Sequence, residues 1–271
     1  MYFEEMGDRT RPTLVFIHGG GISGWMWRQQ VEYFSDFHCL VPDLPEHGKS
    51  SKEGPLSLED CAARIAHLIE TRSGNSKAHV VGHSLGGKVV VELLASRPDL
   101  IDRAVVASAL FGSMFLLNLV HRSSVYKLTV SMMRSKRLRS WTAGQLKFPD
   151  RFSIEKAMED FKVLTPESLY RIYDQLYQYQ EMPNGLAQAQ VPTLVMAGEK
   201  EPRVMKQSVG EIAGALAVSQ GVLLKGADHT YPWTRPDTFN GLVRSWLSEQ
   251  NIEERRFPGV EFLATRSQRM G

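Results

Sequence analysis

The segment AHVVGHSLGGKVV (78–90) places one serine, Ser84, between an apolar run and a pattern in which apolar residues recur every three to four positions. This arrangement predicts a buried strand, a sharp turn and a buried helix. Gly82 and Gly86 leave room for strained backbone at the turn. A small residue in a tight turn is a modest signal, but a serine between strand and helix indicates a nucleophile, provided that a base and an acid follow.

The base should be a histidine on a loop near the C-terminus. The chain has eight histidines, and most of them should be surface or core residues. His229 follows an apolar run at 221–227 and precedes a helical pattern, so it is the predicted general base. We expect His18 and His83 to stabilise turns beside the site.

The acid should follow a strand between Ser84 and His229. The segment VMAGEKEPRVM (195–205) offers Glu199 and Glu201. Pro202 favours extended backbone at Glu201, as in a loop. A buried carboxylate there would hold the imidazole in the required tautomer. We predict Glu201 as the acid and a structural role for Glu199, although both could be surface carboxylates.

The glycine-rich segment FIHGGGISG (16–24) could supply backbone amides to a developing oxyanion, because such amides are fixed before the reaction. Phosphate binding is the alternative for a glycine-rich turn. The sequence matches neither the P-loop pattern nor the dinucleotide fingerprint, and it shows no cluster with metal-ligand spacing. We therefore expect no cofactor and no metal.

Apolar runs alternate with helical patterns along the chain, which predicts a mostly parallel sheet flanked by helices, an α/β fold. Strands are expected at 13–18, 38–44, 78–83, 103–110, 193–198 and 221–227, and helices at 58–72, 86–97, 205–217 and 236–249. The alternation stops between 111 and 186, where helical stretches such as 154–163 and 166–180 predict an inserted cap. The expected domains are a discontinuous core of 1–110 and 187–258, the cap of 111–186 and a loose tail of 259–271.

Four motifs together resemble the α/β-hydrolase superfamily: HGGGISG (18–24), VPDLPEHGKS (41–50), GHSLGG (82–87) and GADHTYPWTRPDTF (226–239). The resemblance spans residues 12–248. It implies Ser84 as nucleophile, His229 as base, the amides of Gly20 and Leu85 as the oxyanion hole, and residues 111–186 as a cap over the pocket.

Three departures from the superfamily pattern matter. Glu201 stands where the family usually has aspartate, and Glu46 replaces a glycine of the family's turn. The short N-terminus also predicts that the family's first antiparallel strand is missing or trimmed.

Composition excludes several other classes. A net charge of +2 does not argue for nucleic acid, and the N-terminus has no apolar signal region, so we expect a cytoplasmic protein. The run Ala104–Val120 is interrupted by polar residues and is interpreted as a strand followed by a helix rather than a membrane span. Cys39 and Cys61 are expected to be buried free thiols.

Serine chemistry on this fold favours hydrolysis of carboxylic esters of small or hydrophobic substrates. The alternatives are hydrolysis of carbon–carbon or other acyl bonds of a small metabolite, and a non-catalytic ligand-binding protein. A solvated helix face is the first interpretation of the basic residues in the cap, and an anionic substrate or membrane surface is the second. They are Arg122, Lys127, Arg134, Lys136, Arg137, Arg139, Lys147 and Arg151. The oligomeric state stays open.

Overall fold

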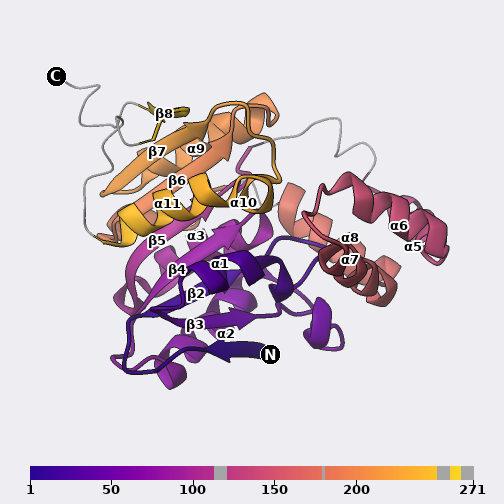
Figure 1. Cartoon of the computed structure of the whole chain (residues 1–271), viewed down its shortest axis with the longest axis horizontal. Coiled ribbons are helices and arrows are strands. Elements are labelled where there is room, and N and C mark those ends of the chain that lie inside the picture. Colours follow the sequence, from indigo (N-terminus) through magenta and orange to yellow (C-terminus); the bar gives the residue numbers. More distant parts are fainter. Residues whose placement is uncertain (113–120, 179–180, 249–256, 264–271) are drawn as a thin grey trace.

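The computed structural model describes residues 1–112, 121–178, 181–248 and 257–263. Its centre is one eight-stranded sheet with the order β1-β3-β2-β4-β5-β6-β7-β8 (Figure 1). The inner strands run parallel, and β1 and β8 pair antiparallel at the two edges. The predicted α/β class is confirmed. The strands are β1 Phe3–Met6, β2 Thr13–Ile17, β3 His38–Pro42, β4 Ala78–His83, β5 Ile101–Ala107, β6 Thr193–Gly198, β7 Ser219–Leu224 and β8 Val260–Leu263.

Helices cover both faces of the sheet, which explains why its central strands are apolar throughout. In β2, Val15 and Ile17 pack into one core cluster, whereas Leu14 and Phe16 pack into another. Successive strand residues point to opposite faces, so each cluster belongs to one face. The first cluster includes residues of α2 Leu58–Arg72, α3 Leu85–Ser96 and α9 Arg203–Ala215. The second includes residues of η1 Gly24–Trp27, α10 Tyr231–Thr234 and α11 Pro236–Leu247, and α1 Arg28–Tyr33 contacts α11 on this face.

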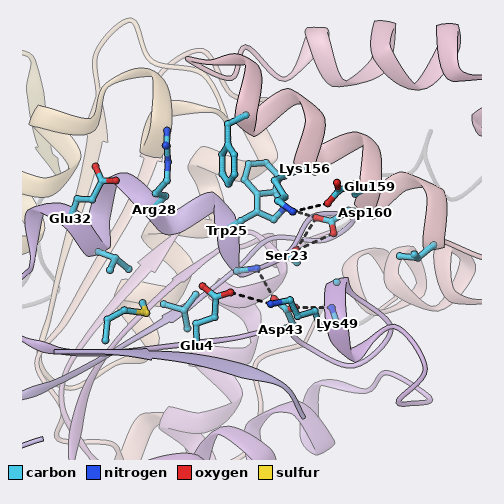
Figure 2. A pocket seen from close by; sticks show the side chains of 17 residues that line it. Glu4, Ser23, Trp25, Arg28, Glu32, Asp43, Lys49, Lys156, Glu159 and Asp160 are labelled. Carbon is cyan, nitrogen blue, oxygen red and sulfur yellow. Dashed lines mark hydrogen bonds and ion pairs between the residues drawn. The ribbon is translucent and has the colours of Figure 1, made fainter. Parts of the chain in front are cut away.

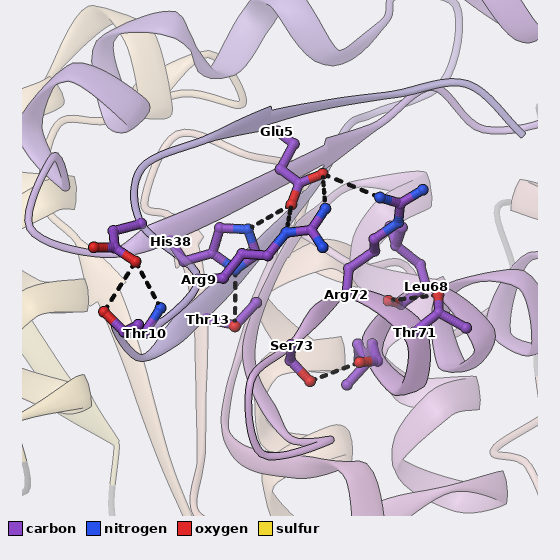
Figure 3. A network of polar contacts seen from close by, with 11 residues as sticks. Glu5, Arg9, Thr10, Thr13, His38, Leu68, Thr71, Arg72 and Ser73 are labelled. Carbon is purple, nitrogen blue, oxygen red and sulfur yellow. Dashed lines mark hydrogen bonds and ion pairs between the residues drawn. The ribbon is translucent and has the colours of Figure 1, made fainter.

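The first antiparallel strand, predicted to be missing or trimmed, is present as the four-residue β1, so the prediction that it is missing is wrong. β1 pairs with β3 in a register that places Glu5 opposite Leu40. Figure 3 shows how Glu5 fastens this strand: its carboxylate accepts hydrogen bonds from Arg9 and from the buried His38, and it pairs with Arg72 of α2. Its hydrogen bond with Arg9 is the main reason that the pKa of Glu5 lies below its usual value. The segment FEEM gives little apolar signal, because an edge strand needs only one covered face.

The C-terminal segment was expected to be a loose tail, and this is wrong for residues 260–263. They form β8, which pairs with β7 and places Val260 opposite Leu224. Val260 is buried. Burial of this one side chain and the strand pairing fix a segment too short to stand out in the sequence. Residues 264–271 lie outside the described part of the chain.

Four helices stand together at one end of the molecule (Figure 1). They are α5 Ser123–Met133, α6 Lys136–Gln145, α7 Arg151–Val163 and α8 Pro166–Tyr177. Two of them begin with side-chain caps, because Asp150 accepts from the amide of Ser153 and Thr165 forms a capping box with Ser168. The helical stretches predicted at 154–163 and 166–180 correspond to α7 and α8. The helix expected within 111–120 falls largely outside the described residues.

Glu46, the residue that departs from the family's glycine, ties these helices to the sheet region. Its backbone has φ +65°, a conformation that favours glycine. Its buried carboxylate binds the guanidinium of Arg171 on α8 through both oxygens, and one oxygen also accepts the amide of Leu56. The ion pair accounts for a glutamate in a turn that strains its backbone.

Two smaller expectations also have outcomes. Cys39 and Cys61 are free and buried, as predicted, and burial raises the pKa of each thiol to about 12. Among the described residues, no helix is long and apolar enough to cross a membrane. The short helical turns that complete the fold are η2 Gly48–Ser50, η3 Pro98–Leu100 and η4 Leu186–Gln188.

Candidate active site

Ser84 occupies the turn between β4 and α3 with φ +55° and ψ −114°, a conformation that is rare for a residue with a side chain. Its amide donates to the carbonyl of Ala107 at 2.8 Å, which ties the turn to β5. The neighbouring glycines are required by space. A Cβ at Gly82 would lie 2.2 Å from the carbonyl oxygen of Gly86, and one at Gly86 would lie 2.2 Å from that of Ile17. The strained serine turn predicted from the sequence is present.

His229 and Glu201 lie side by side although 28 residues separate them in sequence. The imidazole Nδ1 is 2.7 Å from Glu201 Oε2. A proton on Nδ1 is donated to the carboxylate, so Nε2 keeps its lone pair. The Glu201 side chain is 1% exposed and that of His229 is 43% exposed. The carboxylate is therefore inside the protein, and the imidazole reaches outward from it.

Two further donors hold the Glu201 carboxylate. Its Oε1 accepts from the amide of Gly198, the last residue of β6, and from the hydroxyl of Ser108, each at 2.7 Å. Glu199 lies elsewhere: it is exposed, and its Oε2 accepts the amide of Gly226 at 2.7 Å. Of the two candidate acids, Glu201 therefore lies against His229, whereas Glu199 stabilises the turn at Gly226.

Ser84 shares its surroundings with the histidine and the carboxylate. Ser84, His229 and Glu201 line a cavity of about 360 Å³, and Ser84 and His229 also line a second cavity of about 400 Å³. Within the described residues no hydrogen bond joins the serine hydroxyl to His229. This is common in active sites before the substrate binds, when catalytic hydrogen bonds are long or poorly aligned.

The two residues predicted to supply oxyanion amides are neighbours. A Cβ built on Gly20 would lie 3.8 Å from the Cβ of Leu85, the first residue of α3, and only 2.9 Å from Ile172 of α8. Gly20 also lines both cavities with Ser84. A side chain at Gly20 would therefore crowd the space between this loop and α8.

His18 shapes this loop, as expected. Its Nε2 accepts the amide of Leu44 at 2.9 Å, so the proton lies on Nδ1, which donates to the carbonyl of Gly19 at 2.8 Å. Complete burial lowers the pKa of His18 to about 4, which keeps the ring neutral. His83 acts similarly: its Nε2 donates to the carbonyl of His229 at 3.0 Å, and burial lowers its pKa well below the usual value. Both neutral rings position backbone that borders the cavity.

Ser108 is a site residue that the sequence did not reveal. It follows β5 with φ +53°, is buried, and lies 3.1 Å from the hydroxyl of Tyr231 as well as 2.7 Å from Glu201. The only signal was its place after a strand that neighbours β4. The carboxyl ends of parallel strands meet at one edge, where such sites form.

Lys88 is a second residue near Ser84 that the sequence pattern did not single out. It lies one turn after Ser84 on α3, is buried, and donates from Nζ to the carbonyl of Leu176 on α8 at 3.2 Å. Burial lowers the pKa of Lys88 to about 7. The residue links the helix that follows the serine to the helix that covers the cavity.

In the described part of the chain, no group of three or more His, Cys, Asp or Glu side chains is arranged to hold a metal ion. The reactive groups near Ser84 are instead a hydroxyl, an imidazole and a carboxylate.

The sequence matches the model of a known family. The sequence model described as "Alpha/beta hydrolase family" matches residues 14–242. The chain belongs to this family.

Several relatives match most of the chain, among them the following two. A protein of Acinetobacter baylyi, "(E)-2-((N-methylformamido)methylene)succinate hydrolase", is 22% identical over 241 residues, 86% of this chain and 89% of its own length. The "Carboxylesterase YbfK" of Bacillus subtilis is 26% identical over 254 residues, 89% of this chain and 82% of its own. Both relatives carry the names of hydrolytic enzymes.

A solved structure shows the same fold. It comes from work on carboxylesterases of Nitrososphaera gargenis, has a TM-score of 0.74 and is 20% identical in sequence. The match covers 91% of this chain and 93% of that one.

Proposed function

We propose that this alpha/beta hydrolase cleaves carboxylic esters through an acyl-enzyme intermediate, with Ser84 as nucleophile, His229 as general base and Glu201 as the acid that orients it. One observation carries the proposal. A serine held at φ +55° shares a cavity with an imidazole whose Nδ1 is 2.7 Å from a buried carboxylate. That combination serves nucleophilic catalysis, since the nucleophile needs a base and the base needs an orienting group.

The reaction then proceeds in two halves. His229 Nε2 takes the proton of the Ser84 hydroxyl as the oxygen attacks the ester carbonyl, and Glu201 stabilises the imidazolium. The amides of Gly20 and Leu85 stabilise the oxyanion, helped by the position of Leu85 at the N-terminus of α3. Collapse of the intermediate breaks the carbon–oxygen bond, and the imidazolium gives its proton to the leaving alcohol. Water repeats the sequence and releases the acid.

The cavity lining supports an uncharged, hydrophobic substrate. No lysine or arginine lines either cavity at Ser84 among the described residues. The walls are instead mostly aliphatic and aromatic, as in most small-molecule sites. They include Leu169, Ile172, Leu176, Val130, Tyr173 and Tyr177. The name of the Bacillus relative, a carboxylesterase, points the same way.

Hydrolysis of another acyl bond, or of a carbon–carbon bond, in a small metabolite is the second candidate. The observation in its favour is the Acinetobacter relative, which is named for a substituted succinate and matches 86% of this chain. A succinate carries carboxylates, which the lining described above leaves without a cationic partner. This contrast ranks ester hydrolysis first.

A panel of p-nitrophenyl esters with graded acyl lengths tests the proposal. We expect turnover that rises with acyl length until the cavity is filled, and loss of that turnover in Ser84→Ala. Near-wild-type turnover by a folded Ser84→Ala protein would overturn the assignment. Absence of turnover on every ester, with cleavage of a small dicarboxylate, would favour the second candidate.

A further inference from the structure

A third cavity, of about 550 Å³, lies away from the two at Ser84 and shares none of their lining residues. It opens between β1, η1 and α7 of the helical group (Figure 2). Its apolar walls include Val31, Val41 and Trp25. The volume and the apolar walls suit a small organic molecule.

Two buried carboxylates line this cavity, those of Asp43 and Asp160. Asp160 of α7 is 7% exposed. It accepts hydrogen bonds from the hydroxyl of Ser23, at 3.0 and 3.1 Å, and from Nε1 of Trp25 at 2.6 Å. Figure 2 shows Asp160, Ser23 and Trp25 directed toward one another. Both donors are neutral, and Asp160 forms no ion pair with any residue that the structure describes. Burial raises the pKa of Asp160 to about 6.

The other charged groups around the cavity are already occupied. Each basic side chain pairs with an acidic one: Arg28 with Asp150, Lys49 with Glu4, and Lys156 with Glu159. Asp43 accepts the amides of Gly24 and Lys49, each at 2.8 Å. Glu32 is exposed to solvent, which stabilises its charge. Asp160 is therefore a buried carboxylate of this lining whose donors, on Ser23 and Trp25, are neutral and which has no cationic partner among the described residues.

We propose that this cavity binds a protonated organic amine, whose ammonium group pairs with Asp160 while its apolar body lies against Trp25 and the valines. A buried carboxylate without a counter-ion is unfavourable, and a cation that brings its own N–H donors removes that cost. The indole of Trp25 lines the same cavity and offers apolar surface to the body of the amine. An anionic ligand would meet the Asp160 charge at close range.

A ligand series tests the proposal without any substitution. The probes are 2-phenylethylamine, the neutral 2-phenylethanol and the anionic phenylacetate, titrated by calorimetry and by NMR into the full-length protein at pH 7.5. We expect the amine to bind at least about tenfold more tightly than the alcohol, and phenylacetate not to bind. Equal affinity for amine and alcohol, or no binding of the amine, would overturn the proposal.

Two variants locate the binding. Asp160→Asn keeps an oxygen that can accept from Ser23 and Trp25 but removes the charge, so amine affinity should fall to that of the alcohol. Glu32→Gln removes an exposed charge at the same cavity and should change amine affinity less than twofold. Unchanged amine binding in a folded Asp160→Asn protein would contradict the assignment. Ester turnover at Ser84 is a separate readout, so failure of one proposal leaves the other standing.

Discussion

Two buried carboxylates in this protein have opposite surroundings. Glu201 accepts a backbone amide and a serine hydroxyl, and it lies against an imidazole that can become a cation. Asp160 is buried to a similar extent, but its donors are neutral groups of Ser23 and Trp25 and it has no cationic partner among the described residues. Burial alone therefore does not define a catalytic carboxylate. The partners decide whether a buried charge is stabilised within the fold or is left for a ligand.

Replacing Glu201 by glutamine should have the largest effect, because it makes the first carboxylate neutral where its charge is needed. An amide can favour the wrong imidazole tautomer and cannot stabilise the imidazolium. By analogy with a serine protease, kcat should fall by roughly 10⁴-fold. The measurement is kcat on a p-nitrophenyl ester.

The matched control is Glu199→Gln, since Glu199 is exposed and its carboxylate accepts only the amide of Gly226 among the described residues. Its kcat should stay within a few-fold of wild type. If Glu199→Gln proves the more damaging change, the acid has been assigned to the wrong residue.

Removing the Ser108 hydroxyl takes one neutral donor from Glu201 and so tests how far such donors hold the Glu201 carboxylate in place. Hydrogen bonds to charged groups contribute about 1.5–3 kcal/mol, so Ser108→Ala should lower kcat by roughly 10- to 100-fold if the carboxylate loses its position. Ser108→Thr keeps a hydroxyl and serves as the matched variant, which should recover part of the activity. Wild-type kcat in Ser108→Ala would show that the other contacts suffice to hold Glu201.

Asp160→Asn tests the other carboxylate through stability. The folded pKa of Asp160, about 6, lies above the value of 3.8 expected in the unfolded chain. A raised folded pKa means that the associated stability is present below the unfolded value and is lost as pH rises through about 6. The wild type should therefore lose at most about 3 kcal/mol relative to Asp160→Asn between pH 4 and pH 8.

Urea unfolding of both proteins at several pH values measures this difference, with Glu32→Gln as the exposed control. Parallel pH curves for wild type and Asp160→Asn would mean that Asp160 is stabilised by a partner after all. The comparison between the two carboxylates would then fail.

The smallest effect is expected on the exposed basic surface of α5 and α6. Arg134, Lys136 and Arg137 are exposed, and exposed charges interact weakly through water and salt. Reversing these three charges should change KM less than about twofold for neutral and anionic esters alike. Arg139 is left intact because its guanidinium donates to the carbonyls of Met133 and Arg134 at the end of α5. A selective rise in KM for anionic esters would instead indicate an anion-binding surface.

The sequence could predict the strands of the sheet and the three candidate site residues that follow them. The sheet strands were visible because residues such as Val15 and Phe16 are buried on opposite faces, which leaves continuous apolar runs. Ser84, Glu201 and His229 each follow such a strand at the same sheet edge. Strand order therefore brings them together without any knowledge of loop detail.

Other features depend on contacts between distant segments. Asp160 meets Ser23 and Trp25 across more than 130 positions of sequence, and Glu46 meets Arg171 across 125. Neither pair leaves a periodic pattern. The edge strand β1 could not be predicted for a related reason. Ion pairs of Glu5 with Arg9 and Arg72 hold this strand in place, so the residues of the strand need not be apolar.

The most direct test of the central claim is covalent labelling of the serine that would carry the acyl group. The protein is treated with an organophosphonate that reacts with activated serines, and the adduct is located by intact-mass and peptide mass spectrometry. We expect one adduct per chain on Ser84, formed far more slowly in Glu201→Gln and absent in Ser84→Ala. Stoichiometric labelling at another residue, or esterase turnover that survives in a folded Ser84→Ala protein, would contradict it.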